Sequence, residues 1–232
     1  MFFDLIFPVR GEQVPTDHAY SLYGALSRIV REFHDKQSGL HFLTLNGVPA
    51  APRLLQLTDR SRLRVRLPDD QIRLALPLAG KRLDLDGHTI RLGVPSVATL
   101  EPAATLWSRI VTIKHSWQSP HERSKNANRP NLNALPRTLA EASSPDKFLD
   151  SVRRGLAQHG IDGEPTLPLT LSGPRAGQPR RRVLRIHGKA IVGYSLLVAG
   201  LSAEHSLRLQ ELGLGGRGRL GCGFFLPARE GK

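Results

Sequence analysis

The chain opens with a strand pattern and continues into a helix pattern. Phe3, Leu5 and Phe7 occupy every second position up to Pro8, so they would share one face of a β-strand that ends there. A helical spacing follows, with a cap expected at Thr16 or Asp17. Apolar residues recur there at intervals of three and four, which places them on one helix face. They are Leu22, Ala25, Leu26, Ile29, Val30 and Phe33.

The rest of the first half adds two strands, a short helix and a β-hairpin. Residues 40–45 and the alternating residues 63–67 predict two strands, and a short helix follows Pro68. Residues 81–85 and 89–92 flank Asp86-Gly87, which is a strong signal for a hairpin turn. The resulting order, β-α-β-β-α-β, is that of a ferredoxin-like domain.

The second half repeats this order of elements without repeating residues. Strands are predicted at 106–114, 167–171, 183–186, 190–198 and 224–226. Helices are predicted to start at the caps Ser144 and Ser202, the second running through residue 212. The sequence therefore predicts an α+β fold of two tandem ferredoxin-like domains, residues 1–104 and 105–232.

The composition of the chain favours one class of binding partner and disfavours others. With 33 Lys and Arg against 20 Asp and Glu, the net charge is +13, which favours a polyanion such as nucleic acid. The apolar runs are shorter than the roughly 20 residues that cross a bilayer, and the first residues lack the features of a secretory signal. We therefore expect a cytoplasmic protein that does not bind membranes. A single cysteine, Cys222, excludes a disulfide framework and a cysteine-based zinc site.

A glycine-rich loop lies between the last helix and the last strand. Six glycines fall among the eleven residues 213–223, with two arginines between them. Such a backbone can approach a ligand closely and offer its amides to phosphates; the alternative is a helix stop with a tight bend. The loop leads into a strand, unlike a Walker loop or a dinucleotide fingerprint. The candidate RNA-binding residues here are Gly213, Gly215, Gly216, Arg217, Gly218 and Arg219.

This loop and several upstream motifs resemble one known family. A C-terminal helix, a glycine-rich loop with interleaved arginine and a closing aromatic strand resemble the CRISPR-associated endoribonucleases that cut the repeat transcript. Residues 17–28 look like the first helix of that family, and Phe33-His34-Asp35 looks like its helix-end histidine motif. Residues 168–174, followed by Arg180 to Arg182, look like its RNA-facing hairpin. The likeness is to a compact type I subtype and covers nearly the whole chain.

The resemblance implies an activity and a set of partners. It implies metal-independent cleavage of repeat RNA by its own 2′-OH, giving a 2′,3′-cyclic phosphate and a 5′-OH, with the mature crRNA kept bound. It also implies association with other subunits of an effector complex, and no cofactor. The alternative is a non-catalytic subunit that binds repeat RNA, which Ser27 favours because other members carry a catalytic tyrosine or histidine there.

Three histidines are the candidate catalytic residues, since histidine can give or take a proton near neutral pH. His34 matches the helix-end histidine of the family and is the first choice; as an alternative, it would be a cation at a helix C-terminus. His41 and His18 are the next candidates. As alternatives to a catalytic role, His41 would be a residue at a strand edge and His18 a helix residue beside the core. Which of them is the general base stays open. Tyr20 and Tyr23 could stack or donate to phosphate, although their spacing is more typical of core residues.

Basic residues mark the expected RNA contacts. A basic hairpin can enter an RNA groove, although a charged sheet edge that prevents aggregation is the alternative. Lys114 could supply a positive charge beside the reacting phosphate; the alternative is a solvated residue at the end of a strand. The hairpin residues are Arg180, Arg181, Arg182, Arg185 and Lys189, and a further stripe, left open as solvated or RNA-facing, comprises Arg60, Arg62, Arg64 and Arg66.

Two further features of the sequence bear on chemistry and order. No pair of acids at a metal-ligand spacing stands out, so we expect no metal site and disfavour a two-metal nuclease. Residues 116–143 are rich in Ser, Pro, Asn and charge. A loop of this length is expected to be either a mobile linker or an RNA-contacting segment that orders on binding.

Overall fold

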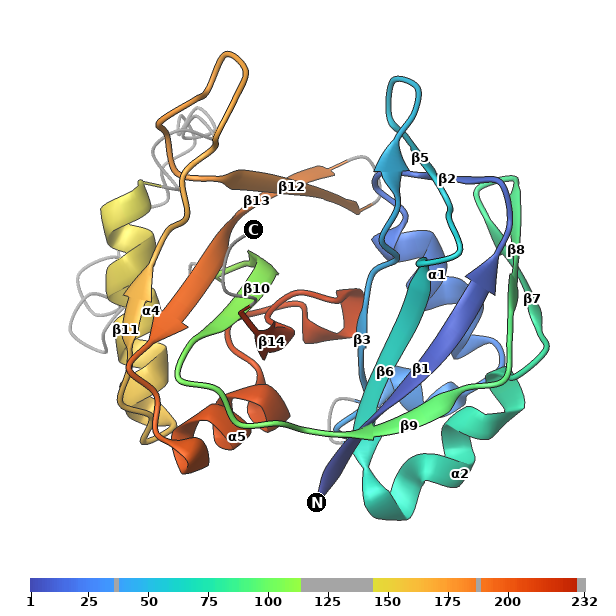
Figure 1. Cartoon of the computed structure of the whole chain (residues 1–232), viewed down its shortest axis with the longest axis horizontal. Helices are drawn as coiled ribbons and strands as arrows, with labels where there is room; N and C mark the ends of the chain where they lie inside the picture. Colours follow the sequence, from blue (N-terminus) through green and yellow to red (C-terminus); the bar gives the residue numbers. More distant parts are fainter. Residues whose placement is uncertain (36–37, 114–143, 187–188, 229–232) are drawn as a thin grey trace, which may run out of the picture.

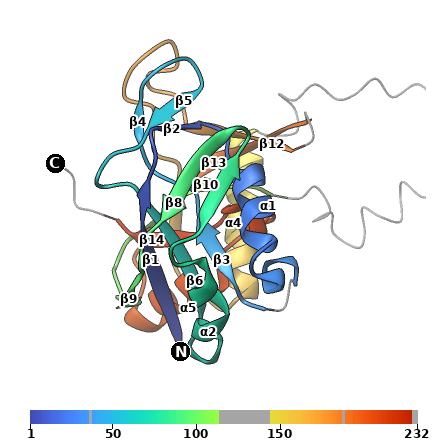
Figure 2. The same ribbon diagram turned by 90° about the vertical axis from the view of Figure 1, so that its right-hand side faces the viewer.

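The computed structural model describes residues 1–35, 38–113, 144–186 and 189–228. Two antiparallel sheets lie side by side, one from the first half of the chain and one from the second (Figure 1). Helices α1 and α4 lie on the same side of the molecule (Figure 2). The predicted candidate Lys114 and the loop at 116–143 fall outside the described residues.

The first sheet carries the expected topology. Its strands run in the order β3-β6-β1-β8-β7, with β9 also paired to β1. A small separate sheet contains β2, β5 and β4. The strands are β1 (Phe2–Arg10), β2 (Gln13–Pro15), β3 (His41–Leu43), β4 (Val48–Pro49), β5 (Leu54–Gln56), β6 (Arg62–Pro68), β7 (Arg82–Leu85), β8 (His88–Leu92) and β9 (Ser96–Thr99). The helices are α1 (Ala19–Ser27), η1 (Arg31–His34), η2 (Asp69–Gln71), α2 (Ile72–Ala75) and η3 (Leu76–Leu78).

The second sheet repeats that arrangement. Its order is β11-β13-β10-β14, with β12 paired to β13. Its elements are β10 (Leu106–Val111), α4 (Pro145–Gln158), β11 (Glu164–Thr166), β12 (Arg181–Ile186), β13 (Lys189–Ala199), α5 (Ala203–Leu212), η5 (Gly218–Leu220) and β14 (Phe225–Pro227). The orders β3-β6-β1-β8 and β11-β13-β10-β14 place the strands of each unit in the same way, with the first strand between the third and the last. This is the strand order of a ferredoxin-like domain. The predicted fold class is therefore confirmed. The boundary between residues 104 and 105 remains our proposal.

The helix caps of the second unit match the prediction, whereas two other local predictions are wrong. Ser144 and Ser202 accept hydrogen bonds from the amides of Lys147 and His205, as N-caps do. The first helix is shorter than its apolar spacing predicts: it is capped at His18, ends at Ser27 and resumes as the 3₁₀ turn η1. The strand expected at 167–171 is also wrong, because β11 ends at Thr166 and only Leu169 bridges to Pro179.

A buried arginine joins the two units. Arg66 is 1% exposed and binds both carboxylate oxygens of Asp4, through Nε at 2.8 Å and Nη2 at 2.9 Å. Its Nη1 donates to the carbonyl oxygens of Gln210 and Phe225 at 2.8 and 2.9 Å. The stripe of arginines is therefore not uniform: Arg66 is an interdomain bridge rather than a solvated or RNA-facing residue, and Arg64 also pairs with Asp4.

Within the described ranges, no helix is long and apolar enough to cross a bilayer.

Candidate functional site

The glycine-rich loop is held by close backbone packing that larger residues would prevent. At Gly223 a Cβ would lie 2.1 Å from the carbonyl oxygen of Leu214, and at Gly215 it would lie 2.5 Å from that of Thr112. Both glycines have positive φ, of 70° and 89°. Thr112 also binds both backbone groups of one loop residue, since the Gly216 N–H donates to the Thr112 carbonyl and the Thr112 hydroxyl donates to the Gly216 carbonyl. The glycines thus fix the loop against β10.

The middle of the loop keeps several amides free of internal acceptors. Arg217 adopts a left-handed conformation, with φ 62°, and is followed by the 3₁₀ turn η5. Such a change of hand between successive residues turns their N–H groups toward one concave point that suits an anion. Among the described residues, none accepts from the amides of Gly215 or residues 217–219. The amides of Gly216, Gly221 and Gly223, in contrast, donate to carbonyl oxygens of the protein itself.

His34 lies beside this loop with one ring nitrogen engaged. The Tyr23 hydroxyl is 2.7 Å from His34 Nδ1, and the two rings meet edge to face. Arg219 of the loop donates to the His34 carbonyl at 2.6 Å, and its guanidinium lies 5.9 Å from the Tyr23 ring centre. His34 is exposed, and no described residue bonds to its Nε2. The structure therefore brings together His34 and the glycine loop, which lie far apart in the sequence.

His41 lies directly under the same loop. It sits on β3 opposite Arg66 in the register with β6, and a Cβ added to Gly218 would lie 3.3 Å from its Nδ1. Burial, followed by the charge of Arg66, lowers the pKa of His41 from 6.5 to about 4. At neutral pH His41 is therefore an uncharged, half-buried ring beneath the loop.

His18 is a structural residue rather than an accessible one. Its side chain is 0% exposed. Its Nδ1 lies 2.7 Å from the Pro15 carbonyl and its Nε2 accepts from the Leu45 amide at 2.9 Å, so Nδ1 carries the proton. Burial lowers its pKa from 6.5 to about 4. With both nitrogens occupied, it has no atom to offer a substrate, and we remove it from the proton-transfer candidates.

His18→Ala is expected to destabilise the fold without removing the chemistry. The change leaves the Leu45 amide and the Pro15 carbonyl unsatisfied in the interior and opens a cavity, at a cost of about 2–4 kcal/mol. The urea midpoint should fall with an unchanged slope, while activity per folded molecule at low temperature stays near that of the wild type. Intact stability together with lost activity would contradict this placement.

Acid should destabilise the protein through the same two histidines. His18 and His41 have folded pKa values of about 4, below their unfolded value of 6.5, so the unfolded chain binds more protons between those values. The contribution of the two histidines to folding stability is complete above about pH 6.5 and falls as the pH drops toward 4. Below about pH 4 it stays constant. Each histidine adds up to about 1.4 kcal/mol per pH unit to the slope of the unfolding free energy against pH. Urea midpoints across this range test it, and His41→Gln should make the slope shallower.

The basic hairpin does not present all its charges on one face. Arg182 pairs with Gly193 and Leu184 with Ile191 in the β12–β13 register, and Leu184 is buried, so this face turns inward. Arg182 Nε donates to the Ser195 hydroxyl at 3.2 Å, and burial lowers its pKa. Arg181 and Arg185 lie on the other face. Of the five predicted contacts, only Arg185 and Lys189 are exposed; Arg180, Arg181 and Arg182 are half-buried.

Ser27 does not face the site. It is 3% exposed, and its hydroxyl has no hydrogen-bond partner among the described residues. A side chain at this position of α1 is buried in the interior of the protein. The absence of histidine or tyrosine at this position therefore removes nothing from the surface formed by His34, Tyr23 and the loop. That weakens the sequence argument for a non-catalytic protein.

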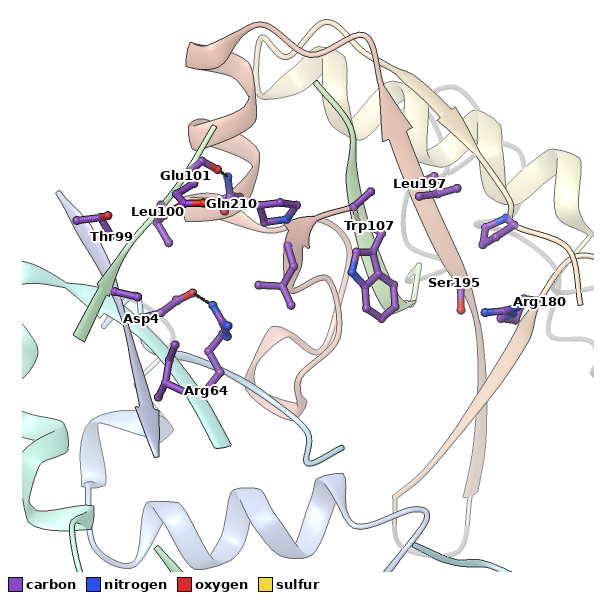
Figure 3. Close-up of a pocket in the computed structure, with 16 residues that line it drawn as sticks. Asp4, Arg64, Thr99, Leu100, Glu101, Trp107, Arg180, Ser195, Leu197 and Gln210 are labelled. Atoms are coloured by element: carbon purple, nitrogen blue, oxygen red, sulfur yellow. Dashed lines mark hydrogen bonds and ion pairs between the residues drawn. The ribbon is translucent and has the colours of Figure 1, made fainter. Parts of the chain in front are cut away.

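A separate pocket opens between the two sheets. It has a volume of about 760 Å³, and none of the three candidate histidines is among its lining residues. Asp4 and Arg64, from β1 and β6, form one wall, while Trp107, Arg180 and Ser195 form the other (Figure 3). Trp107 was not predicted as a site residue, because one aromatic residue in a strand gives no signal of a cleft. Among the described residues, no group of three or more His, Cys, Asp or Glu side chains could hold a metal ion.

The protein is built of tandem ferredoxin-like domains with a histidine, a tyrosine and an arginine gathered at their junction. Residues 3–230 match the family model described as Cas6 Crispr, and the chain belongs to the Cas6 family. It is 38% identical over 227 residues to the "CRISPR-associated endonuclease Cas6" of Myxococcus xanthus, covering 98% of this chain and 82% of that protein.

Solved structures share the fold at low sequence identity. One titled "CRISPR associated protein Cas6" has a TM-score of 0.60 and 11% identity, covering 99% of each chain. Another, titled "Characterization of a Cas6-related gene from Pyrococcus furiosus", has a TM-score of 0.59 and 15% identity, covering 100% of this chain and 99% of that one. These likenesses support the two-domain fold.

Proposed function

We propose that the protein is an endoribonuclease that binds the CRISPR repeat hairpin, cuts the precursor transcript and keeps the mature crRNA. The observation that carries the proposal is the position of His34, exposed, held by Tyr23 and placed beside the glycine-rich loop through Arg219. Family membership and the relative named as an endonuclease support it. The proposal includes a cytoplasmic location, where such transcripts are made, and association with further effector subunits.

The proposed reaction needs no metal ion. A base takes the proton of the ribose 2′-OH, whose oxygen attacks the adjacent phosphorus. The bond from phosphorus to the 5′ oxygen breaks, and an acid protonates that oxygen. The products are a 2′,3′-cyclic phosphate and a 5′-OH, and no water is consumed in this step.

His34 is the proposed proton-transfer residue, acting through Nε2. If Tyr23 donates to Nδ1, then Nε2 carries a proton and can act as the acid; if Tyr23 accepts from Nδ1–H, then Nε2 is free to act as the base. In either tautomer Tyr23 fixes the ring and leaves Nε2 for the RNA. His41, neutral at pH 7, is the second candidate base and lies against Gly218 of the loop.

The loop is the proposed anion site. The amides of residues 217–219 and the charges of Arg217 and Arg219 would bind the scissile or an adjacent phosphate, where negative charge grows during attack. Phosphate contacts further along the RNA are assigned to the exposed Arg185 and Lys189 and to the half-buried Arg181 on the same hairpin. We retain Arg180 as a contact at the cleft pocket, where the Trp107 ring offers a stacking surface for an unpaired base.

The direct test is incubation of the protein with its repeat RNA in EDTA, followed by analysis of the product ends. We expect one cut per repeat, with a cyclic phosphate on one product and a 5′-OH on the other. A repeat that is bound tightly but stays whole in both EDTA and Mg²⁺ would favour the non-catalytic alternative. Cutting that requires Mg²⁺ would contradict the proposed chemistry.

A further inference from the structure

Three arginines form a row across adjacent strands, away from the site described above. Arg10 on β1 lies directly opposite Arg91 on β8, which lies directly opposite Arg82 on β7. All three are exposed. Neighbouring strands are about 4.8 Å apart, and like charges in directly opposite positions oppose strand pairing. In the described part of the chain, none of the three makes an ion pair or a side-chain hydrogen bond.

Protection of a sheet edge does not account for this row. Charged side chains on an edge strand discourage aggregation, and β7 is the edge strand of this sheet. Arg82 on β7 fits that role. Arg91 does not, because β8 lies between β7 and β1. Arg10 adds a third charge to this row at the end of β1, beyond its pairing with β6. The three positive charges repel one another across paired strands and so destabilise the sheet. An anionic partner would explain why they are placed together.

The row continues a face of the sheet that already borders the cleft. Side chains alternate along β1, so Leu5, Phe7 and Val9 are buried while Asp4, Ile6, Pro8 and Arg10 share the other face. Asp4 and Ile6 line the cleft pocket. Arg62 is exposed and lies opposite Pro8 in the β1–β6 register, between the pocket and the row. A basic path therefore leads along this sheet from the cleft to the three arginines.

We propose that this arginine row binds the phosphate backbone of unpaired RNA that extends beyond the repeat. The inference rests on the proposed function and adds a second RNA surface to it. The neighbours that share the face are Pro8, Thr89 and Asp84, none of which is a large apolar side chain. A protein interface needs an apolar or aromatic centre, whereas a row of guanidinium groups suits the regular charges of a phosphate chain.

The test compares two RNAs, the bare repeat and the repeat extended on both sides by an unstructured uridine-rich tail. Affinity is measured over a range of salt for the wild type and for Arg10→Thr/Arg82→Thr/Arg91→Thr. For the extended RNA we expect the triple variant to lose about tenfold at low salt, with a log–log salt slope smaller by about 0.7 per lost contact. Binding of the bare repeat should stay unchanged. The variant should melt at or above the wild-type temperature because repulsion between strands is removed.

The matched control is Arg153→Gln/Arg154→Gln/Arg208→Gln, on α4 and α5, which removes the same charge elsewhere. It should bind both RNAs as the wild type does. The inference is overturned if the arginine-row variant binds the extended RNA normally, if it loses equally on both RNAs, or if the control loses as much. Normal RNA binding with lost association to purified effector subunits would also overturn it and indicate an acidic protein partner. Wild-type cleavage of the bare repeat reports separately on the proposed function.

Discussion

The His34→Ala variant is expected to bind repeat RNA almost as the wild type does and to cut it more slowly by a factor on the order of 10²–10⁴, the usual worth of general acid–base catalysis. The side chain is exposed and its Nε2 has no partner among the described residues, so its removal opens no cavity. Single-turnover rates at saturating protein measure the cleavage step apart from binding.

Two variants accompany that measurement. His159→Ala, at the C-cap of α4, is the matched control and should cut normally. Tyr23→Phe removes the hydroxyl that holds His34 Nδ1; it should slow cleavage less than His34→Ala and shift the pH profile of the rate. Normal cutting by His34→Ala together with loss in His41→Ala would move the proton-transfer role to His41.

Replacing Arg66 with methionine is expected to destabilise the protein by about 3–5 kcal/mol, because it leaves a buried carboxylate with half of its partners. Arg64 still reaches one oxygen of Asp4 at 2.8 Å, but the carbonyls of Gln210 and Phe225 lose their donor. Since those carbonyls belong to the second unit, docking of the domains should weaken as well. Urea unfolding followed by two probes, one in each unit, measures both effects.

The double variant Asp4→Asn/Arg66→Met serves as the control. It removes both charges, so much of the lost stability should return. If Arg66→Met alone is as stable as the wild type, the contacts of Arg66 do not contribute to the stability of the protein. The position of His41 opposite Arg66 would then have to be maintained by other contacts.

Local patterns predicted most of the elements, because each strand and helix buries one face of its own. The alternation in β1 and β6 and the caps Ser144 and Ser202 needed no long-range information. The end of α1 at Ser27 was missed because the apolar spacing continues through Phe33. The 3₁₀ turn η1 buries Phe33 as a continued helix would, so the spacing did not reveal the change of helix type.

The site was predictable only as separate parts. The glycine-rich loop and His34 were both recognised in the sequence, yet their contact through Arg219 joins residues 185 positions apart. Burial separated residues that the sequence treated alike: among the histidines, His18 is enclosed and His34 is open, and among the alternating arginines, Arg66 is enclosed and Arg62 is exposed. Such differences depend on contacts between distant segments, such as Leu45 with His18 and the second unit with Arg66, which local spacing does not encode.

The measurement that tests the central claim most directly uses a repeat RNA with a single 2′-deoxy nucleotide immediately 5′ of the scissile phosphate. The proposed reaction begins with attack by that hydroxyl, so this RNA should bind with wild-type affinity and remain uncut, while a 2′-deoxy nucleotide one position further away should be cut normally. Cleavage of the substituted RNA at its usual place would show that the 2′-OH is not the nucleophile, and the proposed mechanism would be wrong.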